Sequence, residues 1–525
     1  MIFPYRHPGR LFRVLPTFVP HTVFLDRIQP LARRRELRKN GKTAFRAYRQ
    51  AEAMVRIANL DFLVPILAPL YAMAGRPARD PIPVLRSLLV MCHLGVSSIT
   101  QWSYRLEREP ILAQLCGLDP GRLPGVGTFY DLFHRISQSG PSHPVVIRSL
   151  QRPKGAKKGK KAPPRRSGTV GRILRRLRRH PPKPPFTVLL SILRHVVHQS
   201  AERGLLGPDP RPAVAIDGSP LVSGADGHGH RICGCKKEDP CTHPLRRYAD
   251  PGARIGWDSH RNRFFYGRHL SAVVATHGGH DLPIYLRLFQ GGRHDSVAGA
   301  VAFIEAEQLY PEGFSRFVGD SAFDAAAMYV YLDERGTDAV IDLNEREVDS
   351  QAPAQKTGRR RFPRADRRPR ERRGRGKRSL AEREGITLDL TGHARCREGH
   401  ALIKRGSSHG GRYTQWRCPL LTNPDLTCAR PCFYQKHAAS LPKDPRLQTR
   451  IPRGTAAWEA AMDTRTAAER LFSHLKCALG LSNGRHRSDA IWAVHTLVAA
   501  VTMHVQAWAG ILDAAFDRPA PAKAA

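Results

Sequence analysis

The sequence predicts an α/β protein with an all-helical N-terminal domain and a long insertion before its last helices. Up to about residue 150, helical apolar patterns are broken by Gly and Pro, and from residue 186 short apolar strands alternate with helices. A basic, Cys-rich stretch then interrupts this order. We expect a helical domain (1–150), a basic linker (151–185), the first part of the α/β core (186–345), an insertion (346–449) and the last part of the core (450–525).

The composition points to a polyanionic partner. The 525-residue chain carries 85 Lys and Arg against 45 Asp and Glu, a formal charge of +40, with 41% hydrophobic residues. Such a charge disfavours self-association unless a polyanion neutralises it, so nucleic acid is the expected partner. Two basic tracts, 152–183 and 356–378, carry 14 and 13 Lys or Arg. Contact with phosphates is our preferred interpretation of them, and solvated linkers are the alternative.

Two features bear on the cellular location. The first 18 residues contain no apolar core of signal-peptide length. The most apolar long segment, 491–512, contains His495, His504 and Gln506, so we interpret it as a buried helix and not as a membrane span. We therefore expect a cytoplasmic protein with no membrane partner.

The N-terminal sequence predicts two helical regions, of which the first is basic. Residues 31–60 suggest a basic helix, and residues 80–136 read as a compact group of short helices. A helical cluster of this kind either binds DNA or serves a purely structural role, and its pattern leaves both open.

In the core, two predicted strands deliver an acid. Ala213 to Ile216 lead into Asp217 at or just past the strand end, and Phe317 to Gly319 lead into Asp320. The other expected elements are strands at 264–277, 282–290 and 339–343 and helices at 295–310 and 325–334. The two acids would then lie on neighbouring strands of one sheet.

A third acid lies on a helix that we expect over residues 464–476. At 100° per residue, Arg465 and Lys476 lie within about 40° of Glu469, so the helix presents a carboxylate flanked by two cations. Ala468, Leu471, Phe472 and Leu475 form a separate apolar face that would dock on a core. The alternative is a surface helix with ordinary charge pairs, although an Arg that precedes its Glu is the less stabilising order.

These residues resemble the signature of DDE transposases of bacterial insertion sequences. The spacing Arg465, Glu469, Lys476 is similar to their Y-R-E-K signature, with Met462 standing where that signature has Tyr. The order of strands and helices resembles their RNase H-like catalytic core over residues 186–345 and 450–512. Residues 80–136 also resemble the helical N-terminal domain of many such transposases, which implies that the helical domain (1–150) binds DNA. Further motifs of the resemblance are Tyr248–Pro251, Gly256–Ser259 and Ile341–Asn344.

The resemblance implies a metal-dependent reaction on DNA. Asp217, Asp320 and Glu469 would be the catalytic acids that hold Mg²⁺ or Mn²⁺, ions that prefer oxygen ligands. Arg465 and Lys476 would contact DNA phosphates near the bond being broken. Asp295, Asp324 and Asp342 are the alternative carboxylates.

We therefore expect the transposase of an insertion sequence, which binds terminal inverted repeats and target DNA and catalyses cleavage and strand transfer. It would act in the bacterial cytoplasm, associated with the nucleoid, as a homodimer on DNA. The alternatives are an RNase H-like nuclease without strand transfer and a catalytically decayed, zinc-stabilised DNA-binding protein.

Two cysteine clusters are candidates for structural Zn²⁺, with reduced cysteines in loops as the alternative. The first comprises Cys233, Cys235, Cys241 and His243, and the second comprises Cys396, Cys418, Cys428 and Cys432. The insertion that holds the second cluster is highly charged, so we expect it to have little apolar material for a core and to depend on the metal for folding.

Overall fold

The computed structural model describes residues 13–33, 43–72, 76–138, 145–148, 168–180, 184–231, 245–277, 279–344, 385–389, 391–423, 426–428 and 433–511. The chain divides into two compact units, residues 1–316 with 464–525 and residues 317–463. Helices and strands are mixed, and helices alone form most of the region before residue 138, so the predicted α/β class is confirmed. Residues 152–167 and 181–183 of the first basic tract, and the whole second tract (356–378), lie outside the described residues.

The first unit is built on four antiparallel strands. β8 (Arg263–Ala275) pairs with β4 (Ala213–Val222), β7 (Arg254–Asp258) and β9 (Pro283–Gln290). Asp217 lies opposite Ala272 in the middle of β4, not at the end of the strand as the sequence suggested. The strand continues because Gly218 to Val222 keep their pairing with β8.

Helices lie on both faces of this sheet. α11 (Asp295–Leu309) packs on β4, β8 and β9, and α16 (Thr466–Ser473) packs on β4 and β8. Successive residues on a strand face opposite sides of the sheet, so Ser219 faces one side of the sheet and Gly218 faces the other. Lys476, which follows α16, contacts Ser219, whereas Asp295 of α11 lies against Gly218. Asp217 therefore faces the α16 side.

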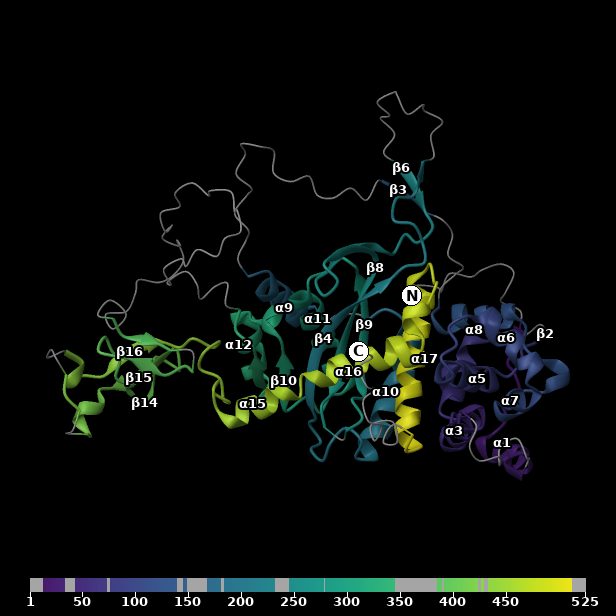
Figure 1. The fold of residues 1–525 in the computed structure, drawn as a ribbon, viewed down its shortest axis with the longest axis horizontal. Coiled ribbons are helices and arrows are strands. Elements are labelled where there is room, and N and C mark those ends of the chain that lie inside the picture. The colour runs from purple at the N-terminus through teal and green to yellow at the C-terminus, as the bar shows by residue number, and fades with distance from the viewer. Residues whose placement is uncertain are drawn as a thin grey trace, which may run out of the picture. The chain divides into compact units, whose positions relative to one another are not determined.

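The apolar helix α17 (Asp489–Trp508) holds the first unit together. It is long and apolar enough to cross a membrane, but 94% of its apolar window is buried within the fold. It packs on β9 and α10 (Thr187–Glu202), and also on the N-terminal helices α3 (Thr43–Ile57), α5 (Pro81–His93) and α8 (Val126–Ile136) (Figure 1). A helix that is apolar all round must be covered on every side. The buried-helix interpretation is confirmed, and the N-terminal helices belong to the same unit as the sheet.

The other N-terminal helices are short, as their Gly and Pro residues predict. They are α1 (His21–Ile28), α4 (Leu63–Leu67), α6 (Ile99–Arg108) and α7 (Pro110–Leu115). Two small sheets accompany them, β1 (Arg13–Val14) with β2 (Arg76–Pro77), and β6 (Leu245–Tyr248) between β3 (Val145–Arg148) and β5 (His230–Arg231).

The segment interpreted as a basic linker contains a helix. α9 (Thr169–Arg179) buries Val170 and Leu174, which lie four residues apart on one face, and packs on α11. Composition alone suggested a linker because Arg dominates this stretch, but two buried apolar residues at helical spacing are enough to dock it on the core.

The second unit contains the insertion and the elements around it. β10 (Arg316–Gly319), α12 (Ala326–Glu334) and β11 (Asp338–Ile341) come first, and α15 (Ala456–Asp463) comes last. The elements between them are β12 (Thr387–Leu388), β13 (Ala394–Arg395), β14 (Ile403–Ser408), β15 (Tyr413–Arg417) and β16 (Ala439–Pro442), in which β15 pairs with both β14 and β16.

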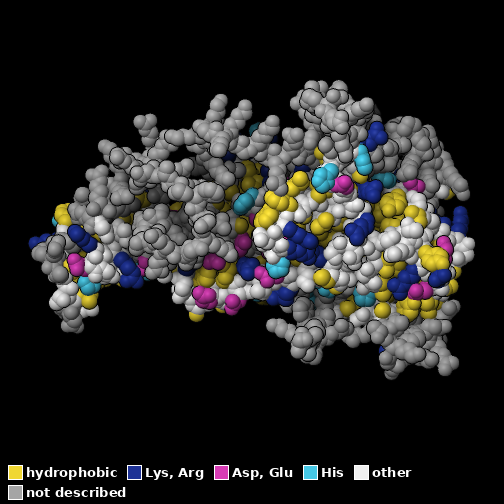
Figure 2. All heavy atoms as spheres, turned by 45° about the horizontal axis from the view of Figure 1, so that its top comes forward, with side chains coloured by type: hydrophobic (Ala, Val, Ile, Leu, Met, Phe, Trp, Pro, Cys, Tyr) yellow, Lys and Arg dark blue, Asp and Glu magenta, His cyan; other side chains and the backbone are white. Residues whose placement is uncertain are grey.

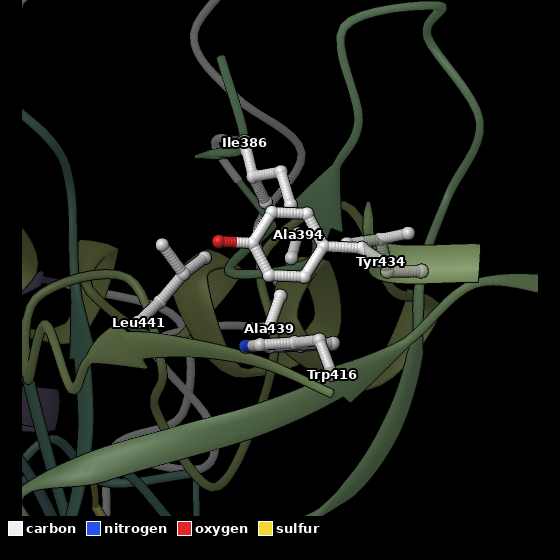
Figure 3. Packing of buried hydrophobic residues seen from close by; sticks show 7 residues of the cluster. Ile386, Ala394, Trp416, Tyr434, Ala439 and Leu441 are labelled. Atoms are coloured by element: carbon white, nitrogen blue, oxygen red, sulfur yellow. The ribbon is translucent and has the colours of Figure 1, made fainter. Parts of the chain in front are cut away.

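The insertion has an apolar core of its own, so the expectation that it lacks one is wrong. The rings of Trp416 and Tyr434 lie on either side of Ala439 (Figure 3). The other buried members are Ile386, Ala394, Leu402 and Leu441. The charged residues that dominated the composition lie mostly at 356–378, outside the described residues, whereas the apolar ones are concentrated after residue 385.

Candidate active site

Asp217 is the acid that the sheet of the first unit presents toward α16. Its carboxylate Oδ1 accepts a hydrogen bond of 2.7 Å from the backbone N–H of Gly218. Asp217 is partly buried, and Ser219 follows two residues later on the same face of the strand. The carboxylate therefore has a fixed position at a solvent-reachable part of the sheet.

Position 218, directly after Asp217, has room only for glycine, because side chains on the opposite face of the sheet lie against it. A Cβ atom at position 218 would lie 2.1 Å from Nε2 of His269 and 2.4 Å from Oδ1 of Asp295. His269 Nε2 and Asp295 Oδ1 are themselves 2.8 Å apart. Burial would raise the pKa of Asp295, but contact with His269 lowers it below its usual range. The alternative carboxylate Asp295 is thus paired with His269 on the far side of the sheet from Asp217.

The predicted helix over 464–476 forms as one continuous helical segment that begins at Thr466, but its last turn is not α-helical. α16 ends at Ser473 and continues as a π-helical turn, η7 (His474–Ala478), which contains Lys476. Arg465 lies at the N-terminal cap of α16, and its Nη2 is 2.9 Å from Glu469 Oε1, with Glu469 53% exposed. A π-helical turn changes the angle per residue, so Lys476 does not follow the stripe expected for a straight α-helix. Met462 lies in the separate helix α15.

Lys476 reaches the same face of β4 as Asp217. Its ammonium group donates a hydrogen bond to Ser219 Oγ. Burial, together with the nearby Arg261, lowers the pKa of Lys476 to about 8, and the carboxylates of Asp258 and Asp217 oppose this shift. The resulting cluster brings Lys476, from the helical segment of α16 and η7 that carries Glu469 (the acidic helix), together with Asp217 of β4.

The hairpin of β7 and β8 lies next to Lys476. Its turn is ordered by Asp258, whose Oδ1 accepts a 3.1 Å hydrogen bond from the Arg261 N–H. The Asp258 side chain is 8% exposed and that of Arg261 is 59% exposed. The hairpin therefore adds a solvent-exposed guanidinium group to the edge of the site.

Side chains far apart in sequence fix the acidic helix. Arg470, adjacent to Glu469, makes two hydrogen bonds to Asp281, one of 2.7 Å from Nη2 to Oδ1. In the π-helical turn, His474 Nε2 lies 3.0 Å from Gln506 Oε1, and Gln506 Nε2 lies 2.9 Å from His93 Nδ1. These contacts tie the segment that carries Glu469 and Lys476 to the sheet, to α17 and to α5.

The N-terminal helices also contact the chain directly after Lys476. Gly95, at φ 68°, ends α5, and a Cβ there would lie 3.3 Å from the carbonyl oxygen of Ala478. Ser97 Oγ donates to the carbonyl of Asn483. The helical domain therefore helps to hold the acidic segment, which sequence patterns did not reveal.

The second unit holds the remaining candidate acids. Asp320 follows β10 and caps the 3₁₀ turn η4 (Ser321–Phe323) by accepting a 3.0 Å hydrogen bond from the Ala322 N–H. Asp342, which follows β11, is exposed, and its N–H donates to the carbonyl of Gly319. Asp324 differs from both, because its side chain is 0% exposed and binds the guanidinium of Arg446. Asp324 is therefore committed to an internal ion pair.

A second charged network in the first unit has a buried core, the pair Arg268 and Asp250, while its third member, Asp489, is 57% exposed. Arg268 donates to both carboxylate oxygens of Asp250, at 2.6 and 2.7 Å, and its Nε donates to Asp489 at 2.6 Å. Ser223 Oγ donates to the same Asp250 carboxylate at 2.6 Å. Asp250 belongs to the Tyr248–Pro251 motif, so this motif links β8 with the start of α17.

The structure describes some of the predicted metal-ligand residues and not others. Among the described residues, no three His, Cys, Asp or Glu side chains form a group able to hold a metal ion. Asp217, Asp320 and Glu469 offer the carboxylate oxygens that Mg²⁺ prefers, but Asp320 belongs to a different compact unit. Cys418 is buried, and Cys396 and Cys428 are partly buried. Cys432 and the whole first cluster (Cys233, Cys235, Cys241 and His243) lie outside the described residues.

Sequence reasoning missed several residues of this site. His269, Arg470, Asp281 and Gln506 act across long sequence separations and carry no local pattern. Arg261 and Asp258 offered a partial signal, because Asp258 belongs to the Gly256–Ser259 motif that was singled out.

The comparison with protein families agrees with this geometry. A family model described as "Transposase DDE domain" matches residues 210–501, which include the central sheet, the insertion and the acidic helix. No curated protein matches the chain.

Proposed function

The chain belongs to the family of DDE transposase domains, and on that premise we propose that it binds the terminal inverted repeats of an insertion sequence and catalyses cleavage and strand transfer. DNA is the partner that the family implies, and the charge of +40 is suited to it. We place its action in the bacterial cytoplasm, as a homodimer on DNA.

The proposed catalytic acids are Asp217, Asp320 and Glu469, which would hold a divalent cation, Mg²⁺ or Mn²⁺. Such a cation activates an oxygen nucleophile and stabilises charge on the phosphate. The supporting observations are that Asp217 and the acidic helix occupy one face of the sheet, and that Arg470 fixes this helix through Asp281. Asp320 would join them from the end of β10.

The proposed role of Arg465 and Lys476 is to bind the phosphates beside the reacting bond. Arg465 lies 2.9 Å from Glu469, and Lys476 donates to Ser219 two residues from Asp217. A cation next to each of two acids would balance the negative charge of a phosphate that enters between them. This arrangement of Lys476, Ser219 and Asp217 is the observation that carries the proposal.

The cysteine cluster of the insertion is proposed as a structural zinc site beside the apolar core. Cys396 packs against that core, and Cys418, two residues after the core residue Trp416, is buried. Because the insertion has its own core, the metal would add to its stability and would not be its sole source. Elemental analysis of reduced, purified protein tests this, and protein that holds no zinc would remove the proposal.

The test of the reaction uses Asp217→Asn, Asp320→Asn and Glu469→Gln with linear DNA that carries the element's ends and Mg²⁺ in the buffer. Each variant should lose on the order of 10³-fold in cleavage rate, the equivalent of several kcal/mol of metal-assisted stabilisation. Glu459→Gln, an exposed acid on α15, is the matched control and should keep the wild-type rate. Near wild-type strand transfer by any of the three variants would contradict that residue's assignment.

Two alternative functions remain distinguishable. A related nuclease would produce cleaved ends without joined products, so quantifying both products from one reaction separates it from a transposase. A decayed, zinc-stabilised DNA-binding protein would bind the ends and show no metal-dependent cleavage at all.

A further inference from the structure

A cavity of about 250 Å³ lies between α10, β9 and α17. These three elements pack on one another within the first unit (Figure 1). The lining is mainly apolar, and its large side chains come from all three elements: Phe186, Leu189, Leu193, Leu288, Phe289 and Leu497. Protein interiors keep few voids larger than one water molecule, which needs about 10–15 Å³, and an apolar void destabilises a fold in proportion to its volume. A cavity of this size therefore indicates space for a ligand.

The cavity is elongated and open at one end. On α17 its lining residues run along one face from Asp489 to Ala500, which spans about 16 Å at 1.5 Å per residue. Asp489 and Gln290 are exposed and lie at the same end, because Arg268 binds the one and pairs with the other. At the other end, Tyr285 and Ala500 are buried. This shape fits a single unbranched chain that enters from solvent.

Two polar residues of the lining have buried atoms without a hydrogen-bond partner among the described residues. Thr496 is 4% exposed, and its Oγ1 is one of these atoms. Nε and Nη1 of Arg287 are the others, and Nε lies 3.6 Å from Oε2 of Glu305, too far for a hydrogen bond. Leaving a buried polar group unpaired is costly, so a ligand atom that accepts a hydrogen bond here would remove an unfavourable contribution.

The charges around the cavity favour an uncharged acceptor. Glu305 is 1% exposed, accepts from the Tyr285 hydroxyl at 2.8 Å and lies beside Arg287, so the Arg287 charge already has a counter-ion. Asp489, at the open end, is paired with Arg268 at 2.6 Å. A ligand carboxylate would therefore find no unpaired cation among the described lining residues, and a buried charge without a partner is strongly unfavourable.

We propose that this cavity binds an uncharged aliphatic molecule that carries a hydroxyl or carbonyl oxygen. The chain would lie along the apolar side chains of α10 and α17, and the oxygen would accept a hydrogen bond from the Thr496 hydroxyl, with the Arg287 N–H groups as further donors of the lining. A mainly apolar pocket with a few polar groups that fix orientation is typical of small-molecule sites. The inference does not rest on the proposed function, because none of these residues belongs to the proposed catalytic or DNA-binding set.

The test measures binding of 1-octanol to the full-length, DNA-free protein by isothermal titration calorimetry. Figure 2 shows groups of Lys and Arg side chains on one face of the molecule, where an anionic probe would also bind outside the cavity, so the probe is uncharged. Wild type should bind one molecule per chain. 1-Hexanol, which is shorter by two methylene groups, should bind about 15-fold more weakly if the chain is buried. Octanoate should not displace 1-octanol at equal concentration.

Two substitutions locate the site. Ala493→Leu adds a larger side chain in the lining near the open end, on a helix that tolerates Leu, and should abolish binding. Thr496→Val keeps the shape of the side chain and removes the hydroxyl, so binding should weaken by about 2- to 12-fold, the range for one neutral hydrogen bond. Thr496→Val tests the site by itself if Ala493→Leu does not fold.

Thr502→Val is the matched control. Thr502 is also buried on α17, but its hydroxyl donates to the Val498 carbonyl at 2.7 Å and it is not part of the lining. This variant should bind 1-octanol like the wild type.

Three results would overturn the proposed site: no one-to-one binding of 1-octanol to wild type, unchanged affinity in a folded Ala493→Leu, or a loss in Thr496→Val no larger than in Thr502→Val. Displacement of 1-octanol by an equal concentration of octanoate would overturn the uncharged class of ligand. Because every measurement uses DNA-free protein, the outcome does not depend on whether the protein cuts DNA.

Discussion

Two charged regions of the first unit, both built on β4 and β8, differ in how completely their charges are matched. In the network of Asp250, Arg268 and Asp489, the guanidinium is 2% exposed and the Asp250 carboxylate is 0% exposed, and each makes several hydrogen bonds, so this pair is sealed although the outer Asp489 is 57% exposed. Around Asp217 and Lys476, the Asp217 side chain is partly exposed and the exposed Arg261 adds positive charge, while Glu469, on the helix that leads to Lys476, is 53% exposed. A sealed, mutually satisfied network stabilises the fold, whereas an open cluster retains interactions for a ligand.

The largest expected effect comes from opening the sealed network. Asp250→Ala leaves Arg268 buried without its bidentate partner, and breaking a buried pair in this way costs about 3–5 kcal/mol. Urea unfolding, monitored by hydrogen exchange in β8, should show this loss. Asp226→Ala, in an exposed turn, is the control and should unfold like the wild type. An Asp250→Ala protein of wild-type stability would show that the network is not structural.

A second sealed network should make stability depend on pH. In the buried chain from Trp508 Nε1–H through Ser200 to His504, the ring accepts from Ser200 at Nδ1 and donates to the Pro283 carbonyl. Burial lowers the pKa of His504 from 6.5 to about 4. The unfolded chain therefore binds the proton first, so this stabilisation is complete above pH 6.5 and is lost as the pH falls toward 4.

The size of this pH effect follows from the shift, at about 1.4 kcal/mol for each pH unit between the two pKa values. Burial also lowers the pKa of His495 to about 3, so several groups contribute to the decline. The measurement is the unfolding free energy of wild type and His504→Gln at pH 8, 6 and 4.5. The destabilisation caused by the substitution should shrink as the pH falls, and a constant difference would contradict a neutral buried His504.

A smaller effect is expected at the anchor of the acidic helix. Arg470→Ala removes a partly exposed guanidinium from the nearly buried Asp281, which should cost about 1–2 kcal/mol. Amide exchange in α16 should become faster and DNA cleavage slower, because Glu469 would lose its fixed position. Arg470→Lys should recover part of both. Unchanged exchange in α16 would show that other contacts suffice to hold the helix.

The smallest stability effect is expected at the open cluster itself. Asp217→Asn should change the unfolding free energy by less than about 1 kcal/mol, since residues kept for function contribute little to stability. This variant should nevertheless lose cleavage activity. Substitution in the buried network would then lower stability, whereas substitution at Asp217 would lower activity and leave stability nearly unchanged. A destabilisation as large as that of Asp250→Ala would make Asp217 a structural residue and remove the contrast.

Local patterns alone determined much of this protein. Apolar runs and Gly and Pro breaks located β8, β9, α11, α12 and the short N-terminal helices, because strand and helix periodicity are written in neighbouring residues. The spacing of Arg465, Glu469 and Lys476, together with Asp217 and Asp320, was enough for the resemblance to DDE transposases, and the family match confirms that family, whereas the Y-R-E-K subtype stays a prediction. A motif of given residue types at fixed separations can be recognised in the sequence without knowledge of the fold.

Only the tertiary structure decided where those residues point and what holds them. The continuation of β4 past Asp217 depends on pairing with β8, and the π-helical turn at Lys476 forms in a segment that contacts α5 and α17. Apart from Thr466, which lies four residues from Arg470, the partners of Arg268, Arg470 and His504 lie 18 or more residues away in sequence, and most lie more than 180 away. Hydrogen bonds and burial between such distant segments leave no periodic trace in the sequence, so the separation of sealed and open charge clusters emerges only on folding.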